Sequence, residues 1–119
     1  MANIMLQDKE VGPFFLGDQL PDLFLTLVWD SGGPVDLTSF PTAAFTVKRL
    51  HGQNTVMGGS VTDGAITYGS ATNGEVNVRW PAAFTEPGTY RFRLTLGSSD
   101  TPIRHQTVQR LIFRVTEDE

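Results

Sequence analysis

Cysteine is absent from the 119 residues of this sequence, so neither a disulfide framework nor a thiolate metal site can form. Long apolar runs are missing too. The longest, Leu23 to Trp29, is too short to span a bilayer and is interrupted by Thr26. The first ten residues lack the basic start and apolar core of a Sec signal peptide. We therefore expect a protein made in the cytoplasm, with no membrane among its partners.

Signatures of catalysis and of cofactor binding are equally scarce. The two histidines, His51 and His105, lie far apart in sequence, and the chain has no Gly-x-Ser-x-Gly elbow, phosphate-binding loop or His-x-x-x-His pair. The segment from Asp30 to Asp36 lacks the closely spaced oxygen ligands and closing glutamate of a calcium loop, so we interpret it as a turn. We therefore expect that the protein is not an enzyme and has no catalytic residues, no metal or other cofactor, and no small-molecule substrate.

A basic excess is the next missing feature. The formal net charge is −4, whereas a dedicated nucleic-acid binder usually carries a clear positive excess, so nucleic acid is not an expected partner. An apolar fraction of 39% and a charged fraction of 18% describe an ordinary globular chain rather than a disordered one.

Turn residues are abundant, and they predict the fold class. Twelve glycines and seven prolines divide the chain into short segments, none of which keeps a helical period. Gly58-Gly59 and Asp63-Gly64 bracket a stretch with weak strand signals. We expect an all-β fold, an Ig-like antiparallel β-sandwich of about seven to eight strands. The sandwich is predicted to occupy residues 17–119, after an N-terminal arm at residues 1–16. The expected strands and extended pieces cover residues 23–29, 35–38, 44–50, 66–68, 75–80, 90–96 and 106–115.

The segment Pro87-Gly88-Thr89-Tyr90 is the strongest marker of this fold. A Pro-Gly turn delivers a tyrosine to the start of an alternating strand, as at the corner of an Ig-like sandwich. We expect the Tyr90 ring to enter the core and its hydroxyl to bond to backbone upstream. Alternation along the strands predicts an inner row of side chains at Leu23, Leu25, Leu27, Trp29, Val76, Val78, Trp80, Tyr90, Phe92, Leu94, Leu96, Leu111, Phe113 and Val115.

The same alternation places arginines on the outside. Arg79, Arg91 and Arg93 are expected to face outward, joined by Arg110 and Arg114. Seven of the nine basic residues are arginine, which suits bidentate pairing with carboxylates of a neighbouring chain. The alternative is a solvated sheet face with local partners. A cross-strand row of like charges destabilises a sheet unless an opposite charge lies nearby. The acidic end of the sequence, residues 116–119, is a candidate for that opposite charge, within one subunit or between subunits.

Large apolar residues are also in surplus near the N-terminus. Phe14, Phe15 and Leu16 precede the first clear strand, and Phe24 lies on the outer row of that strand. A monomeric sandwich rarely exposes so much apolar surface. Either the arm folds back over its own sheet, or it docks on a neighbouring subunit by strand addition, which we prefer.

Several motifs in a fixed order carry a resemblance to a known family. They are Gly17-Asp18-Gln19-Leu20-Pro21, Leu25-Thr26-Leu27, Asp30-Ser31-Gly32, Pro34-Val35-Asp36-Leu37-Thr38 and Pro87-Gly88-Thr89-Tyr90. In this order the sequence resembles the Ig-like domain at the N-terminus of phage baseplate upper proteins, and related domains of other tail and virion proteins, over residues 17 to 116.

The resemblance implies a non-enzymatic structural protein of a tailed-phage virion, in the tail, baseplate or neck. Its implied partners are other virion proteins and copies of itself, and its implied location is the virion after synthesis in the host cytoplasm. We expect the protein–protein contacts to use Phe14, Phe15, Leu16 and Phe24 as an apolar dock, with Arg79, Arg91 and Arg93 as the charged part. The alternative function is a module that binds host-surface carbohydrate or another cell-surface ligand.

Overall fold

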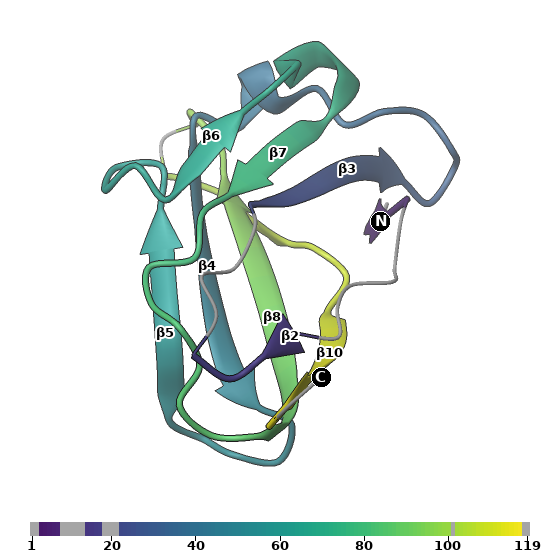
Figure 1. The fold of residues 1–119 in the computed structure, drawn as a ribbon. Helices are drawn as coiled ribbons and strands as arrows, with labels where there is room; N and C mark the ends of the chain where they lie inside the picture. Colours follow the sequence, from purple (N-terminus) through teal and green to yellow (C-terminus); the bar gives the residue numbers. More distant parts are fainter. Residues whose placement is uncertain (1–2, 8–13, 18–21, 101, 118–119) are drawn as a thin grey trace.

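The computed structural model describes residues 3–7, 14–17, 22–100 and 102–117 and has two β-sheets packed face to face. Figure 1 shows β3, β6 and β7 in one layer and β4, β5 and β8 in the other. The predicted all-β, Ig-like sandwich is confirmed. Ten strands are present among the described residues, more than the seven or eight expected, because several are only two or three residues long.

The smaller sheet has four strands and is antiparallel throughout. The central pair is formed by residues 23–26 of one strand and 75–78 of the other, with Leu23 opposite Val78 and Leu25 opposite Val76. These apolar pairs share one face, as the period of two requires. In spatial order the strands are β1 (Ile4–Leu6), β3 (Leu23–Trp29), β7 (Glu75–Val78) and β6 (Ile66–Tyr68).

The larger sheet has six strands around one long central strand. That strand, β8, pairs with β4 along eight residues on one side, and with β10 and then β9 on the other. At the edge of this sheet, β10 pairs in parallel with β2, whereas the other strand pairs of the sheet are antiparallel in the described residues. In spatial order the strands are β2 (Phe14–Phe15), β10 (Leu111–Thr116), β8 (Gly88–Gly97), β4 (Thr42–Arg49) and β5 (Thr55–Ser60), with β9 (His105–Thr107) also beside β8.

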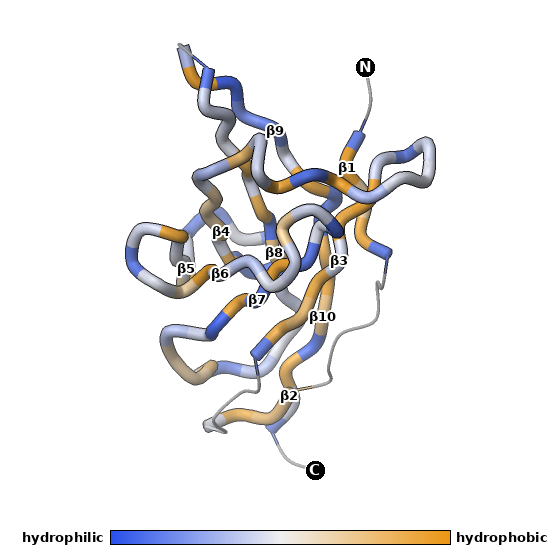
Figure 2. Tube along the Cα trace, turned by 90° about the horizontal axis from the view of Figure 1, so that it is seen from above, coloured by the Kyte–Doolittle hydropathy of each residue, from blue (hydrophilic) through white to orange (hydrophobic). Residues whose placement is uncertain are grey.

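The core lies between the two sheets and contains nearly all of the predicted inner row. Figure 2 shows hydrophobic segments in strands of both sheets, and burial alternates along the longer strands such as β4, β8 and β10, which give one face to this core. Every residue of the predicted inner row is buried except Trp29, which is half-buried at the end of β3. Among the described residues, no polar or charged side chain is buried.

The predicted tyrosine corner is confirmed. The Tyr90 ring is buried, with its centroid 4.7 Å from that of Phe84, and its hydroxyl donates to the Glu86 carbonyl at 2.6 Å. Arg49 lies over the Tyr90 ring, 5.4 Å from the centroid, and donates to the Pro87 carbonyl at 3.3 Å while pairing with the Glu86 carboxylate. Strand β4 thus holds the turn that starts β8.

Strand β5 was not predicted, and the extended piece predicted at 35–38 was only partly right. Gly58 and Gly59 lie inside β5 instead of bounding a turn. Position 58 requires glycine because a Cβ there would lie 2.7 Å from the carbonyl oxygen of Phe45 on β4. The predicted extended piece at 35–38 ends in a 3₁₀ helix, η1 (Leu37–Ser39). Asp36 caps this helix by accepting from the Thr38 N–H at 3.0 Å. A second 3₁₀ helix, η2 (Ala71–Asn73), precedes β7.

The predicted last strand, 106–115, is divided into β9 and β10. At the break, Val108 donates to the Leu94 carbonyl at 2.8 Å, and Gln109 donates to the Ile4 carbonyl at 2.9 Å. Between β9 and β10 the chain therefore contacts both β8 and β1 of the other sheet. A continuous strand would have left Ile4 without this partner.

Segments of the expected arm at 1–16 pair with strands of the expected sandwich at 17–119. Ile4 and Leu6 of β1 are 1% and 3% exposed, and β1 pairs with β3. Phe14 and Phe15 form β2, which pairs with β10 of the same chain. Residues 8–13 of the expected arm, and residues 18–21 of the first family motif, lie outside the described residues.

Candidate functional site

The described residues contain no cluster suited to holding a metal ion. No group of three or more histidine, aspartate and glutamate side chains comes close enough to hold a metal ion in the described ranges. His51 follows β4 near the start of β8, whereas His105 pairs with Gly97 at its end. A strand of that length separates them by roughly 25–30 Å at 3.3 Å per residue. The two histidines therefore cannot act on one substrate.

A membrane-crossing helix is not found in the part of the chain that the structure describes.

The apolar residues predicted near the N-terminus do not form one exposed dock. Phe14 packs edge-on against Trp80 and Phe113, with ring centroids 5.6 and 5.5 Å away. Leu16 also packs against the core, and its N–H donates to the Thr116 carbonyl at 3.0 Å. Phe15 is half-buried. In the structure this strand is added to the sheet of its own chain, and docking on a neighbouring subunit stays a prediction.

Phe24 is the exposed member of the predicted apolar dock. Its side chain is 69% exposed on the outer face of the four-stranded sheet, opposite Asn77 of β7. Arg79 follows β7 and is exposed, and alternation after buried Val78 places it on the same outer face. Phe24 and Arg79 therefore share one surface.

Arg91 and Arg93 lie on the other sheet, so the three predicted arginines are not one patch. Both belong to β8, where Arg91 is opposite Lys48 and Arg93 is opposite Thr46. The outer faces of a two-layer sandwich point in opposite directions, which separates this pair from Arg79. Lys48 and Thr46 were not singled out from the sequence, although the period of two in β4 places both on the outer row.

Four side chains, which we call the basic hollow, surround a small depression of about 50 Å³ on the outer face of β4 and β8. They are Thr46, Lys48, Arg91 and Arg93. Arg91 is held in place by donating from Nη2 to the Gly52 carbonyl at 2.7 Å. The ion pairs of the described residues join Arg49 to Glu86 and Arg104 to Asp100, and neither includes a cation of the basic hollow.

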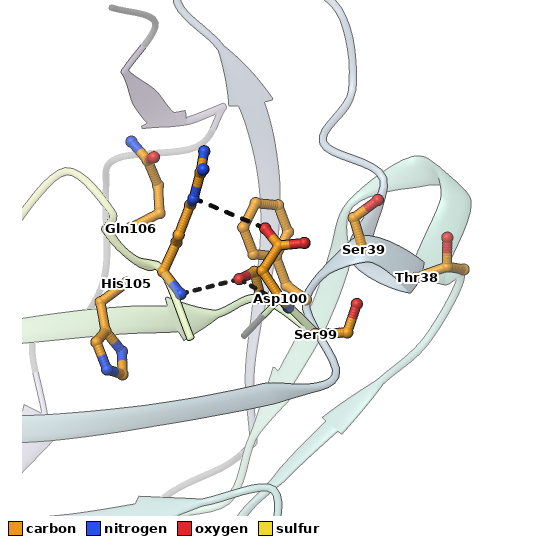
Figure 3. Close-up of a pocket in the computed structure, with 9 residues that line it drawn as sticks. Thr38, Ser39, Ser99, Asp100, His105 and Gln106 are labelled. Carbon is orange, nitrogen blue, oxygen red and sulfur yellow. Dashed lines mark hydrogen bonds and ion pairs between the residues drawn. The ribbon is translucent and has the colours of Figure 1, made fainter. Parts of the chain in front are cut away.

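A larger polar pocket of about 490 Å³ lies between η1 and the β8–β9 connection. Figure 3 shows Asp100 between the helix that carries Thr38 and Ser39 and strand β9, from which His105 and Gln106 point apart. Arg104 donates its N–H to Ser98 Oγ at 2.9 Å. Next to the pocket, the Asp36 carboxylate accepts from the hydroxyl and the N–H of Thr38, and these bonds lower the pKa of Asp36. Phe40 supplies an aromatic wall.

Comparison with known proteins gives a fold and no family. No protein-family model matches the sequence, and no curated protein matches it. The crystal structure of CopC from Methylosinus trichosporium OB3b is similar, with a TM-score of 0.55 and 17% identity, over 98% of this chain and 97% of that one. At this identity the likeness shows a shared β-sandwich over almost the whole of both chains.

Proposed function

We propose that this chain is a structural protein of a tailed-phage virion, in the tail, baseplate or neck, and that it acts through repeated protein–protein contacts without catalysis. It is made in the host cytoplasm and then assembled with other virion proteins and with copies of itself. Neither nucleic acid, a membrane nor a small-molecule substrate takes part.

The observation that carries the proposal is the composition of the two outer faces. One presents Phe24, a large aromatic group that is 69% exposed, and the other presents three cations without carboxylate partners among the described residues. Aromatic and arginine side chains are enriched in protein–protein interfaces and among the residues that contribute most to binding. The ordered motifs from Gly17 to Tyr90 support the phage assignment by resemblance.

The direct test is a cryo-EM map of the intact particle from cells that encode this chain. We expect density for the sandwich at several symmetry-related positions, with Phe24 or the basic hollow at a subunit contact. Purified particles whose map and protein composition lack this chain would contradict the proposal.

A second candidate function is a module that binds host-surface carbohydrate or another surface ligand. The polar pocket favours it, because residues with hydroxyl, amide, carboxylate and imidazole groups line it together with Phe40. The test is glycan binding by the purified chain and by an Asp100→Ala, Gln106→Ala variant. Binding that the variant loses would favour this function, and no binding at millimolar glycan would exclude it for the glycans used.

A further inference from the structure

The outer face of the six-stranded sheet places like charges directly opposite each other. Lys48 of β4 is the register partner of Arg91 of β8, and Arg93 is the next outward residue along β8. Like charges at cross-strand positions destabilise a sheet unless an opposite charge is added. An anion that binds to the outer face would compensate the repulsion between these cations.

The geometry of the basic hollow suits one carboxylate group. Its volume is about 50 Å³, whereas one water needs roughly 10–15 Å³, so the three heavy atoms of a carboxylate fit. The Gly52 carbonyl already fixes Arg91, which leaves its other N–H donors available. The Thr46 hydroxyl and the second guanidinium, at Arg93, line the same depression. A bidentate contact can thus form with little loss of side-chain freedom.

The anion that this chain itself offers is its acidic segment, Glu117-Asp118-Glu119. These are three consecutive carboxylates in a chain whose net charge is −4. The number of carboxylates equals the number of cations at the hollow, which are Lys48, Arg91 and Arg93. Charge complementarity therefore exists between two parts of the same sequence.

The acidic segment of one molecule is badly placed to reach its own basic hollow. Strand β10 runs antiparallel to β8, and Val115 is opposite Gly88, so the chain leaves the sheet at the start of β8. Along β8 the hollow begins at Arg91, about 10 Å from Gly88, and extends to Arg93, about 17 Å from Gly88, so the segment would have to turn back along the strand and lie fully extended. Three residues span at most about 10 Å, and residue 117 is already past the end of the ladder. The acidic segment of a second copy can approach the basic hollow from outside, because it is not tied to the end of β10 in the same molecule.

We propose that the basic hollow binds the acidic segment, residues 117–119, of a second copy of this chain. The inference rests on the proposed function, because it names the partner for one of the repeated contacts. Each subunit then gives one acidic segment and receives another, so the contact joins two different surfaces and repeats from copy to copy.

A nucleic-acid phosphate is the competing ligand for such a face, and the observations favour the carboxylate. The whole chain is acidic, and the hollow accepts one anionic group instead of a row of phosphates along a groove. Binding of DNA is accordingly an outcome that the experiment must be able to detect.

The first measurement uses a peptide with the sequence of residues 115–119, capped at both ends, as the probe. The receptor is the full chain carrying Glu117→Gln, Asp118→Asn and Glu119→Gln, so that its own segment does not compete. We expect NMR shifts at Thr46, Lys48, Arg91 and Arg93, and an affinity at least tenfold weaker after Arg93→Ser. Arg79→Ser, on the opposite face, is the matched control and leaves the affinity unchanged.

The second measurement is sedimentation of the full chain over a range of protein and salt concentrations. We expect self-association that weakens at least tenfold with added salt, with Arg91→Ser plus Arg93→Ser, or with the neutralised acidic segment. A charge-reversal pair tests the contact directly. One variant carries Lys48→Glu, Arg91→Glu and Arg93→Glu, and the other carries lysine at positions 117–119. We expect association to be restored when the two variants are mixed. Thermal melts check that each variant is folded, and Arg93→Ser alone serves if Arg91→Ser disturbs the Gly52 loop.

Two results would overturn the inference. One is failure of the peptide to bind at millimolar concentration, together with self-association that persists in the arginine variants. The other is binding of a mixed-sequence DNA oligonucleotide at moderate salt that is lost with Arg91→Ser plus Arg93→Ser. Both are measured on purified protein and are independent of particle composition. Failure here is therefore distinguishable from absence of the chain in the particle, which would contradict the proposed function.

Discussion

At the scale of single residues, Gly74 occupies a position that leaves no room for a side chain. Its φ is +75°, in the left-handed region, and a Cβ there would lie 2.3 Å from the Leu27 carbonyl oxygen. We predict that Gly74→Ala lowers the free energy of unfolding by more than about 2 kcal/mol, because strain and a backbone clash add together. Urea unfolding measures the change.

The matched control for that substitution is Gly33→Ala. Gly33 has no neighbour within 4 Å of a built Cβ and no positive φ, so the change is expected to stay within about 0.5 kcal/mol. Equal effects of the two substitutions would show that η2 and its cap do not constrain the backbone as described.

The hydroxyl of Tyr90 is predicted to add stability that depends on pH. Tyr90→Phe removes the bond to the Glu86 carbonyl and lowers the free energy of unfolding at pH 7 by about 1 kcal/mol. Burial raises the pKa of Tyr90, so the unfolded chain releases this proton first, from about pH 10 upward. The wild type therefore loses stability as the pH rises above about 10.

The Tyr90→Phe variant lacks the part of this pH-dependent loss that comes from the Tyr90 hydroxyl. The difference in free energy of unfolding between wild type and variant, measured by urea unfolding, should therefore narrow between pH 7 and pH 10.5. Burial also raises the pKa of Tyr68, and that contribution is present in both proteins. A difference that stays constant over this range would contradict the assignment to the Tyr90 hydroxyl.

The corner tyrosine could be predicted from sequence because its determinants are local. Pro87, Gly88 and Tyr90 are within four residues of one another, and so is the Glu86 carbonyl that accepts the hydrogen bond. The contribution of Arg49 could not be predicted, because it comes from a strand 37 residues earlier and depends on how β4 pairs with β8. The same limit hid Lys48 as the neighbour of Arg91.

At the scale of elements, strand β2 is predicted to stabilise the isolated molecule. Phe14→Ala removes a ring that contacts Trp80 and Phe113, and we expect a loss of about 2 kcal/mol, below the roughly 3–5 kcal/mol of a fully buried phenylalanine. The control is Phe24→Ala, which changes the same residue type on an exposed face and should cost less than about 0.5 kcal/mol. Both values come from chemical denaturation at a protein concentration where the chain is monomeric.

A Phe14→Ala variant as stable as wild type, with altered assembly, would instead support docking of this strand on a neighbour.

Strands with a strong period of two were predicted well, and short ones were not. The strand at Leu23–Trp29 has the predicted bounds, and β8 differs from its prediction by only a few residues at its ends. Strands β1 and β2 have three and two residues, too few to show a period. Strand β5 contains two glycines that long-range packing against Phe45 requires, and local rules interpret such a pair as a turn.

At the scale of the whole molecule, three strand pairs among the described residues join segments far apart in sequence, which predicts slow folding. Strand β4 pairs with β8, β3 with β7, and β2 with β10, across intervals of about 40 to 100 residues. We expect a main refolding phase between milliseconds and seconds, because these loops must close before the core forms. Stopped-flow fluorescence follows the burial of Trp80, and a main phase faster than about 100 μs would contradict the topology.

The whole-molecule function was less accessible from sequence than the fold. Outward positions were assigned correctly for Phe24, Arg79 and Arg93, because alternation along a strand gives the face. Alternation does not say to which sheet a strand belongs, so Arg79 was grouped with arginines of the opposite surface. Only the pairing of β7 with β3 and of β8 with β4 separates them.

The parallel pairing of β2 with β10 also bears on how the molecule carries mechanical load. Val115 is opposite Phe14, and Thr116 is opposite Phe15. Tension that arrives at Phe14 from its N-terminal side and at Thr116 from its C-terminal side pulls the two strands along their length in opposite directions. Hydrogen bonds between strands lie across that direction, so they are loaded together in shear rather than opened one at a time. This strand pair therefore resists stretching of the chain as a unit.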